Sequence, residues 1–518
     1  DGLWVHRDIY SIVETPDGYR WEDKFARYEN YDASGRPTES GDAGGSIVKA
    51  VYESQENGRL MGYADRNGSQ VIWFSYNADG LISAVYDAEN RRVEYEYENG
   101  LPVRVTDVLG NATLFEYDDQ CRLLQSIDPS GDETEISYDR GGRALSVTDG
   151  TGNGKHFEYG YDDLRKQFYT KIKTTGGLVK ELWFDKEGDT RRIDINGETI
   201  KKIEKRGNNL MITDASGAVV QKEYDEWDNL KKVVYPDGSA IKYEYDLRFN
   251  KPARITDEMG VVHTFEYDDS GNPTKKTYAA GSADEQITEY DYDDMGNVTA
   301  VRRLKGGAGV YVTDAEVTRT YDQYGNKISE TDAGGNTTLF TFDDFGNMTS
   351  RQDGNGHLWQ YSYDDAGNLL STADPLGNQT FHEYDARGRL VRITDARGNR
   401  TAYTYDERGR VVSVTDAYGN STQTEYDADG NVISRTDREG NQIFYEYDEN
   451  NRLIKTIDGN GNTIEQVYAD YGSSSCSLCS SAPSDRPVKV IYPTFTKQFT
   501  YDERGRKIIE TDMPAPSD

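Results

Sequence analysis

Apolar and polar residues alternate along most of the chain in short runs, and turn-forming residues separate these runs. Between Tyr405 and Tyr426, the β-branched run 411–415 and the run 421–426 are each long enough for one strand. The intervening segments 406–410 and 416–420 each begin with an Asp, which can bond its own downstream backbone, and contain a Gly, which readily adopts a positive φ. The pattern therefore predicts a β-hairpin.

This hairpin pattern returns with a fixed period. An aromatic marker recurs every 21 residues, and an Asp follows it directly in all but the last case. A constant period of this length indicates a repeat architecture. We therefore predict an all-β fold, a repetitive β-hairpin meander, in which these residues are the structural markers: Tyr321, Phe342, Tyr363, Tyr384, Tyr405, Tyr426, Tyr447 and Tyr468.

A second aromatic residue often stands two positions before the marker, as in Tyr361/Tyr363 and Tyr403/Tyr405. Residues i and i+2 share one face of a strand, and the residue between them is usually polar. We therefore expect one face of the sheet to carry aromatic rings and the other face to be exposed to solvent. Ring pairs on adjacent strands would contribute ~0.2–1 kcal/mol each.

The regularity of the repeat divides the chain into five expected segments. The stretches around 165–180, 197–210, 276–288 and 303–316 interrupt the period and are where we expect special contacts with a partner, because inserted loops often carry function. The segments are a β-rich lead-in at 1–57, regular repeats at 58–161, irregular repeats at 162–320, regular 21-residue repeats at 321–470, and a Cys-x-x-Cys loop with a final, truncated repeat at 471–518.

Composition alone would suggest a poorly folded chain. Only 35% of the 518 residues are hydrophobic, and the net charge is −33. The 39 tyrosines and the strict period argue instead for a folded sheet with little conventional core. The negative charge disfavours binding to nucleic acid or anionic lipid and suits a basic partner or high solubility. No stretch approaches the ~18–20 apolar residues of a membrane span.

The double-turn pattern resembles the YD repeat of the Rhs family. The resemblance rests on Tyr363–Asn368, Tyr384–Arg389 and Tyr405–Arg410, together with the Thr-Asp-x-x-Gly-Asn turns between them, and it covers roughly residues 60–512. It implies a strip that spirals into a hollow shell. In that family the shell encloses a C-terminal toxin, as in Rhs polymorphic toxins and toxin-complex B/C components, or serves as a wall-associated or teneurin-like scaffold.

One feature of that family is not found in this sequence. The Asp-Pro-rich segment that closes the shell and releases the toxin has no counterpart, because Asp128-Pro129 and Asp374-Pro375 lie within repeat turns. About twenty hairpins with strands ~4.8 Å apart make a strip roughly 200 Å long, about one circuit of a wide cavity. We therefore expect a partial YD-repeat shell, a fragment of a larger shell, or an open scaffold.

Candidate chemistry is sparse. The five histidines (6, 156, 263, 357, 382) fall at unrelated repeat positions, and the asparagines of Asn-x-Thr sequences are adequately explained as turn residues. Oxygen-bearing residues alternate at 353–357 and 458–462, as in calcium loops, but the distal Glu and flanking helices of such a loop are missing. We expect no catalytic residue, metal or cofactor, and interpret these segments as ordinary turns.

Cys476 and Cys479 are the one informative cysteine pair. Three interpretations stay open: a small disulfide loop, two free thiols, or half of a metal site that would need further ligands. Cys121 lies in a repeat turn, where we expect it to act as a small residue.

The sequence therefore predicts a non-catalytic YD-repeat shell segment of a bacterial secreted or cell-surface protein. Its expected role is to encapsulate, carry or display a polypeptide, so its partners would be a polypeptide cargo or further shell segments of the parent chain. The alternative is an extracellular adhesion or carbohydrate-binding scaffold, in which exposed Tyr and Trp rings bind a cell-surface receptor or glycan. Neither hypothesis involves nucleic acid or membrane insertion.

Overall fold

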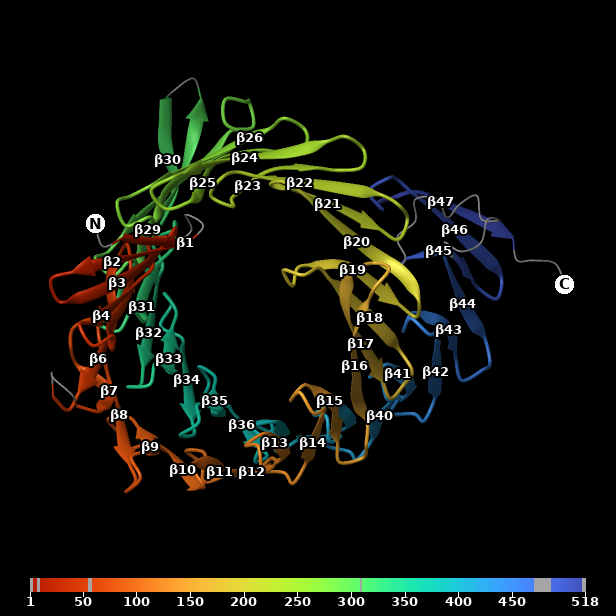
Figure 1. Cartoon of the computed structure of the whole chain (residues 1–518), viewed down its shortest axis with the longest axis horizontal. Helices are drawn as coiled ribbons and strands as arrows, with labels where there is room; N and C mark the ends of the chain where they lie inside the picture. Colours follow the sequence, from red (N-terminus) through yellow and green to blue (C-terminus); the bar gives the residue numbers. More distant parts are fainter. Residues whose placement is uncertain (1–2, 7–9, 55–57, 308–309, 470–485, 515–518) are drawn as a thin grey trace. The chain divides into compact units, whose positions relative to one another are not determined.

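A computed structural model of the chain describes residues 3–6, 10–54, 58–307, 310–469 and 486–514 (Figure 1). Within these ranges the chain forms 47 β-strands in one sheet and no α-helix. The strands described as pairs are antiparallel and consecutive in sequence, as are β38 (Arg400–Tyr405) with β39 (Val411–Thr415) and β39 with β40 (Ser421–Tyr426). The predicted all-β hairpin meander is confirmed.

The strands of the first half of the chain are those up to β29. Their bounds are β1 Leu3–His6, β2 Tyr10–Thr15, β3 Gly18–Asp23, β4 Tyr28–Asp32, β5 Pro37–Asp42, β6 Gly45–Tyr52, β7 Leu60–Asp65, β8 Gln70–Tyr76, β9 Ile82–Tyr86, β10 Arg92–Glu98, β11 Leu101–Thr106, β12 Ala112–Tyr117, β13 Leu123–Ile127, β14 Glu133–Tyr138, β15 Ala144–Asp149, β16 Gly154–Asp162, β17 Gln167–Thr174, β18 Val179–Phe184, β19 Thr190–Ile195, β20 Glu198–Arg206, β21 Asn209–Asp214, β22 Val219–Tyr224, β23 Leu230–Val234, β24 Ala240–Asp246, β25 Lys251–Thr256, β26 Val262–Tyr267, β27 Pro273–Tyr278, β28 Gln286–Tyr292 and β29 Val298–Gly307.

The second half is more regular, and its strands are mostly five or six residues long. The remaining bounds are β30 Val310–Tyr321, β31 Lys327–Thr331, β32 Thr337–Phe342, β33 Met348–Gln352, β34 Leu358–Tyr363, β35 Leu369–Ala373, β36 Gln379–Tyr384, β37 Leu390–Thr394, β41 Val432–Thr436, β42 Gln442–Tyr447, β43 Leu453–Ile457, β44 Thr463–Tyr468, β45 Pro487–Ile491, β46 Phe495–Tyr501 and β47 Lys507–Pro514.

The chain divides into two compact units, which we describe separately. Unit 1 comprises residues 1–112, 223–233 and 240–381, and unit 2 comprises residues 113–222, 234–239 and 382–518. Each unit thus combines an earlier and a later length of the strip. The five segments expected from the sequence follow repeat regularity rather than contacts, and they stay a prediction.

The turns have one repeating geometry. In the turn after Tyr405, the Asp406 N–H donates to the Arg410 carbonyl (3.0 Å), and the Gly409 N–H donates to the Asp406 carbonyl (2.9 Å). The Asp406 carboxylate accepts the backbone N–H groups of Arg408 and Arg410. Gly409 has a φ of 77°, in the left-handed region that favours glycine. The predicted roles of Asp and Gly in the turn therefore agree with the structure.

Side chains alternate between the two faces but few are fully buried. In β40, Thr422, Thr424 and Tyr426 are half-buried, whereas Gln423 and Glu425 are exposed. The clearest apolar cluster among the described residues joins Ala469, Val488 and Tyr501, with Phe499 packed against it. Strand ladders and turn contacts, rather than a thick core, therefore supply much of the order.

Candidate functional site: repeat turns and the seams between strip lengths

A β-bulge precedes seven of the eight markers, namely Tyr321, Phe342, Tyr363, Tyr405, Tyr426, Tyr447 and Tyr468. In the β38–β39 pair, Thr404 faces Ser413 but Tyr405 faces Val411, so Val412 is an extra residue on β39. The same register shift occurs at Tyr363, Tyr426 and Tyr447. A bulge interrupts the ladder of backbone hydrogen bonds and leaves local polar groups to find other partners.

The marker tyrosine of the following repeat supplies such a partner. The Tyr426 hydroxyl donates to the carbonyl of Val411 (3.1 Å), the residue that faces Tyr405 at the bulge. The Tyr405 hydroxyl donates to the Leu390 carbonyl (2.7 Å) in the same way. Tyr405 and Tyr426 therefore each tie their own strand to the first residue of the strand after the preceding marker turn.

The predicted markers occupy the same place in their repeats. Hydroxyl-to-carbonyl bonds join Tyr321 to Val298, Tyr363 to Met348, Tyr447 to Val432 and Tyr468 to Leu453, at 2.8–3.0 Å. Phe342 ends β32 without a hydroxyl, and Tyr384 ends β36. Cys476 and Cys479 lie outside the described residues. Cys121 is an exposed free thiol with a φ of 63°, at the turn position that glycine usually occupies.

Arginine closes several turns and covers the next marker ring. The guanidinium of Arg389 lies 4.8 Å from the centre of the Tyr405 ring while its Nε contacts the Asp385 carboxylate at 2.7 Å. Arg410 covers Tyr426 at 4.3 Å, and Arg452 covers Tyr468 at 4.7 Å. For these markers the ring partner found is therefore an arginine of the preceding turn, which differs from the expected pairing of rings. Ring pairs do occur at irregular repeats, such as Tyr169 with Trp183 at 5.2 Å.

These contacts shift the pKa values of both groups. Hydrogen bonds from the Arg122 side chain and then its backbone N–H lower the pKa of Asp118. Burial raises the pKa of Tyr405, and the nearby Asp385 carboxylate raises it further. The carboxylate is therefore held charged and the phenol neutral, which are the states that the hydrogen bonds of the repeat need.

The turns form two edges of the strip. The Tyr-Asp edge consists of the turns that follow a marker, or that follow the aromatic residue at the same position of another repeat; examples are 385–389 and 406–410. The Thr-Asp edge consists of the turns that lie between these along the chain; examples are 128–132 and 149–153. In both units the Tyr-Asp edge of the later length contacts the Thr-Asp edge of the earlier length. We call these contacts seams.

The seam of unit 2 consists mainly of arginine–aspartate pairs. Arg387 contacts Asp128 at 2.5 Å and also Asp132, which lies 255 residues earlier. Arg408 contacts Asp149, 259 residues earlier, at 3.0 Å. Further along, Arg504 lies 3.8 Å from the centre of the Tyr235 ring. Arg387, Arg408 and Arg504 all stand three residues after a marker, directly before the turn glycine.

The seam of unit 1 uses different side chains at the same edges. The Lys24 Nζ donates to the Trp227 carbonyl at 2.7 Å across 203 residues, and Asn250 donates back to the Lys24 carbonyl at 2.6 Å. The Arg91 guanidinium lies 3.2 Å from the centre of the Phe345 ring. The strip therefore returns alongside itself within each unit, which our estimate of about one circuit did not anticipate.

The seam position could have been suspected from the sequence but was missed. The third residue after the marker is Arg at 387, 408 and 504, whereas turn chemistry places no demand on that residue type. The recurrence of Arg at this position indicates a contact with residues outside the turn. Its partner aspartates were hidden among the 92 acidic residues of the chain.

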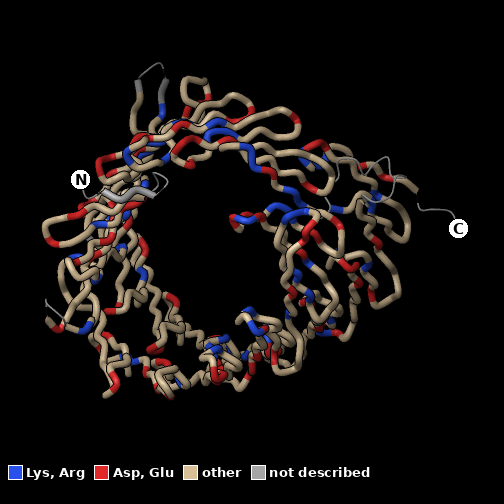
Figure 2. The backbone as a smooth tube through the Cα atoms, in the orientation of Figure 1, with Lys and Arg blue, Asp and Glu red and all other residues tan. Residues whose placement is uncertain are grey.

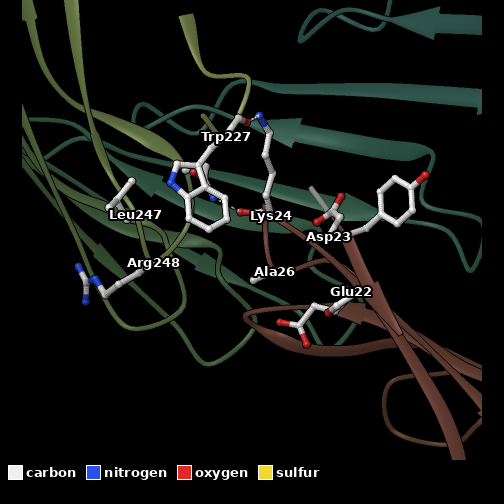
Figure 3. A pocket seen from close by; sticks show the side chains of 10 residues that line it. Glu22, Asp23, Lys24, Ala26, Trp227, Leu247 and Arg248 are labelled. Carbon is white, nitrogen blue, oxygen red and sulfur yellow. Dashed lines mark hydrogen bonds between the residues drawn. The ribbon is translucent and has the colours of Figure 1, made fainter. Parts of the chain in front are cut away.

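The unit 1 seam borders a cleft of about 400 Å³. Figure 3 shows the indole of Trp227 between Leu247 and the Lys24 side chain, with Glu22 and Arg248 nearby. Trp227 is 37% exposed and Leu247 is 64% exposed. The cleft thus offers an open aromatic surface beside polar groups, an arrangement that can hold a ligand with apolar and polar faces.

Two features are absent from the part of the chain that the structure describes. No group of three or more His, Cys, Asp or Glu side chains there is arranged to hold a metal ion. Among the same residues, no helix is long and apolar enough to cross a membrane.

The RHS Repeat family model matches the chain eight times. The matches cover residues 76–112, 97–133, 210–240, 245–283, 321–358, 342–379, 384–421 and 426–463, which together make up just over half of the chain.

Two similar proteins cover part of the chain. Double-stranded DNA deaminase toxin A of Burkholderia cenocepacia (strain H111) is 23% identical over 239 residues, which are 38% of this chain and 16% of that protein. Probable deoxyribonuclease RhsB of Dickeya dadantii (strain 3937) is 26% identical over 267 residues, 39% of this chain and 18% of that protein. The chain therefore spans less than a fifth of these relatives.

Solved structures with a similar course include the crystal structure of TcdB2-TccC3-TEV. That comparison has a TM-score of 0.48 and 16% identity, and covers 98% of this chain and 26% of the other. A Photorhabdus luminescens Tc holotoxin pore gives a TM-score of 0.45 and 13% identity, covering 98% of this chain and 29% of the other.

Proposed function

The chain belongs to the RHS repeat family, and we propose that it forms part of the wall of a scaffold that encloses a polypeptide toxin. In this proposal the chain is not itself an enzyme. The activities named for its two relatives would belong to parts of those proteins outside the matched repeats. Its partners would be the enclosed polypeptide and further wall segments of the parent protein.

The seams are the observation that carries this proposal. A single strip holds its strands together along the ladder but leaves both turn edges free. In each unit, however, a later Tyr-Asp edge meets an earlier Thr-Asp edge, as Arg387 and Arg408 do with Asp132 and Asp149. Edge-to-edge contact turns a ribbon into a surface, and a surface is what a wall around a polypeptide requires.

We also propose a secreted or cell-surface location, because a toxin scaffold has to leave the cell that makes it. The names of the two relatives, a toxin and a deoxyribonuclease, support this placement. Fractionation of the producing bacterium with an antibody against the chain tests it. Detection only in the soluble fraction inside the cell would contradict this part of the proposal.

Protease protection in the full gene product tests the enclosure. We expect the non-repeat part of that product to resist trypsin in the native protein and to be cleaved once the seams are loosened by Arg387→Ala and Arg408→Ala. The double variant Arg397→Ala/Arg400→Ala removes the same charge from exposed positions and serves as the control. Equal cleavage in native, seam and control proteins would contradict a wall function.

A second candidate function is adhesion through a receptor or glycan. The cleft in Figure 3 favours it, because exposed Trp227 lines the same cleft as Glu22 and Arg248, and sugars commonly present an apolar face and hydroxyl groups together. Glycan-array binding that is lost in Trp227→Ala but kept in Trp359→Ala, at a tryptophan that does not line the cleft, would support this candidate. Absence of any glycan binding would contradict this second candidate, and the scaffold proposal would then stand by itself.

A further inference from the structure

The charge of the segment 165–206 runs against that of the chain. The segment contains 12 Lys and Arg and 7 Asp and Glu, a net charge of +5, whereas the whole chain carries −33. The segment forms β17 to β20 and the turns between them, all within unit 2. In Figure 2 blue segments gather where Figure 1 places β19 and β20. A local reversal of this size marks a surface with its own electrostatic character.

Two of these cations lie in a row of side chains that crosses three neighbouring strands. Pairing places Trp183 of β18 opposite Arg192 of β19, and Arg192 opposite Lys202 of β20, so the three side chains share one face. The guanidinium of Arg192 lies 5.7 Å from the centre of the Trp183 ring, and that of Arg165 lies 4.7 Å from it. Stacking on an indole fixes an arginine while leaving N–H donors at its rim available for other groups.

A buried carboxylate holds the row in place. Asp194 is 1% exposed and accepts hydrogen bonds from the Trp183 Nε1 at 3.0 Å and from the Arg192 Nε at 2.6 Å. A buried charge is tolerated only when it is paired and hydrogen-bonded, as Asp194 is here. The site is therefore preorganised, because Arg192 cannot turn away without leaving the buried Asp194 charge without its cation.

The row opens into a cleft of about 590 Å³ whose charged lining is largely basic. Arg165, Arg191, Arg192, Lys202, Lys205 and Arg206 line it, with Glu204 as the one acid among the lining residues. Asp162, Asp185 and Asp189 pair with some of these cations from beside the cleft. Lys202 and Arg206 both contact Glu204, at 2.6 and 3.0 Å, so two cations share a single carboxylate.

We propose that this cleft binds an acidic polypeptide segment through its side-chain carboxylates. The cleft already pairs Arg165 and Arg192 with the Asp162 and Asp194 carboxylates, through one side-chain hydrogen bond each, and arginine can bind a further carboxylate through its remaining N–H donors. The binding does not depend on enclosure, so it stands apart from the proposed scaffold function.

Size and charge favour a short acidic peptide over a nucleic acid. Nucleic-acid affinity accumulates over roughly 6–10 phosphate contacts along an extended basic track. Here the cations line one cleft. A longer polyanion would extend beyond the cleft onto the rest of the chain, which is strongly acidic and would repel it. A few neighbouring Glu or Asp side chains fit the cleft without that repulsion.

Fluorescence polarisation with a labelled hexaglutamate peptide tests the proposal on the intact chain. We expect saturable binding at low salt that weakens as salt rises, because the contacts are charged. Lys202→Glu/Arg206→Glu is expected to weaken binding by at least about tenfold. Arg397→Glu/Arg400→Glu makes the same change in net charge at exposed positions of unit 2 and is expected to leave binding unchanged.

Two further measurements keep the outcome decisive. Lys202→Gln/Arg206→Gln removes the cations without adding repulsion, and an unchanged urea midpoint shows that either variant still folds. The proposal is overturned if the native chain shows no saturable binding, or if the cleft and control variants lose binding equally. A single-stranded oligonucleotide with six phosphates that binds more tightly than the peptide would also overturn it, by assigning the cleft to nucleic acid.

Discussion

At the scale of a residue, the third position after the turn aspartate decides whether the turn is strained. Glycine holds it with a positive φ in most turns, as Gly398 does at 82° and Gly409 at 77°. Asn90, Asn451 and Asp228 hold it elsewhere, also with positive φ. Ala26 and Cys121 also hold it, with φ of 61° and 63°. Asn and Asp tolerate this conformation better than other side chains, so Ala26 and Cys121 are the costly residues.

Exchanging the residue type at this position should change stability in opposite directions at two sites. A Cβ on Gly398 would meet nothing within 4 Å, so Gly398→Ala tests the backbone alone. We expect it to lower the free energy of unfolding by roughly 1–2 kcal/mol, and Cys121→Gly to raise it by a similar amount. Urea unfolding followed by circular dichroism measures both. If both variants changed the free energy of unfolding in the same direction, the assignment of this turn position would be contradicted.

Alkaline pH should loosen the sheet through its tyrosines. Burial, with neighbouring Tyr290 and Asp268, raises the pKa of Tyr292 to about 12. Because the folded pKa lies above the unfolded value of ~10, the neutral phenol stabilises the fold fully below pH ~10, and this contribution is lost as pH rises toward 12. Urea midpoints across that interval should fall. A constant midpoint would show that the hydroxyls are not sequestered.

At the scale of an element, the hairpin and its bulge explain why a hydroxyl recurs. The sequence predicted the strands, both turns and the shared face of Tyr403 and Tyr405 from local alternation. It did not predict the bulge, because the extra residue Val412 looks like any other strand residue and only pairing with β38 reveals the shift. The acceptor of the tyrosine hydroxyl, a backbone carbonyl, also leaves no mark in the sequence.

Removing the hydroxyl of a marker tyrosine should therefore lower the free energy of unfolding more than removing the hydroxyl of the tyrosine two residues earlier. Tyr405→Phe deletes the bond to the Leu390 carbonyl and should lower the free energy of unfolding by about 1 kcal/mol. Tyr403→Phe, two residues earlier on the same face, is the matched control and should change it little. Comparable losses in the two variants, measured by urea unfolding, would argue against a special role of the marker.

At the scale of the whole molecule, the seams were the part least open to prediction. Arg387 and Asp132 are separated by 255 residues, and no local pattern records which turn meets which. Their pairing depends on how the strip bends over many repeats, a sum of small twists that composition and period do not specify. The family resemblance implied a spiralling strip, but not the side chains that join its lengths.

Weakening the unit 2 seam should loosen its turns without unfolding its hairpins. The paired side chains are partly exposed, so each pair should contribute about 1 kcal/mol or less. In Arg387→Ala/Arg408→Ala we expect faster hydrogen exchange at the turns 128–132 and 149–153, and little change at β42 and β43. Arg397→Ala/Arg400→Ala is the control. Unchanged exchange in the seam variant would mean that these pairs do not hold the edges together.

Chemical cross-linking across a seam tests the central claim most directly. In a chain whose three native cysteines are replaced by serine, Asp149→Cys/Arg408→Cys should be joined by a short bismaleimide within one molecule, because these side chains meet at 3.0 Å. Asp149→Cys/Arg397→Cys, which pairs two Thr-Asp edge turns, should not. Efficient linkage of the first pair and not the second is the predicted result. Failure of the first pair, or equal linkage of both, would contradict a strip that returns edge to edge alongside itself.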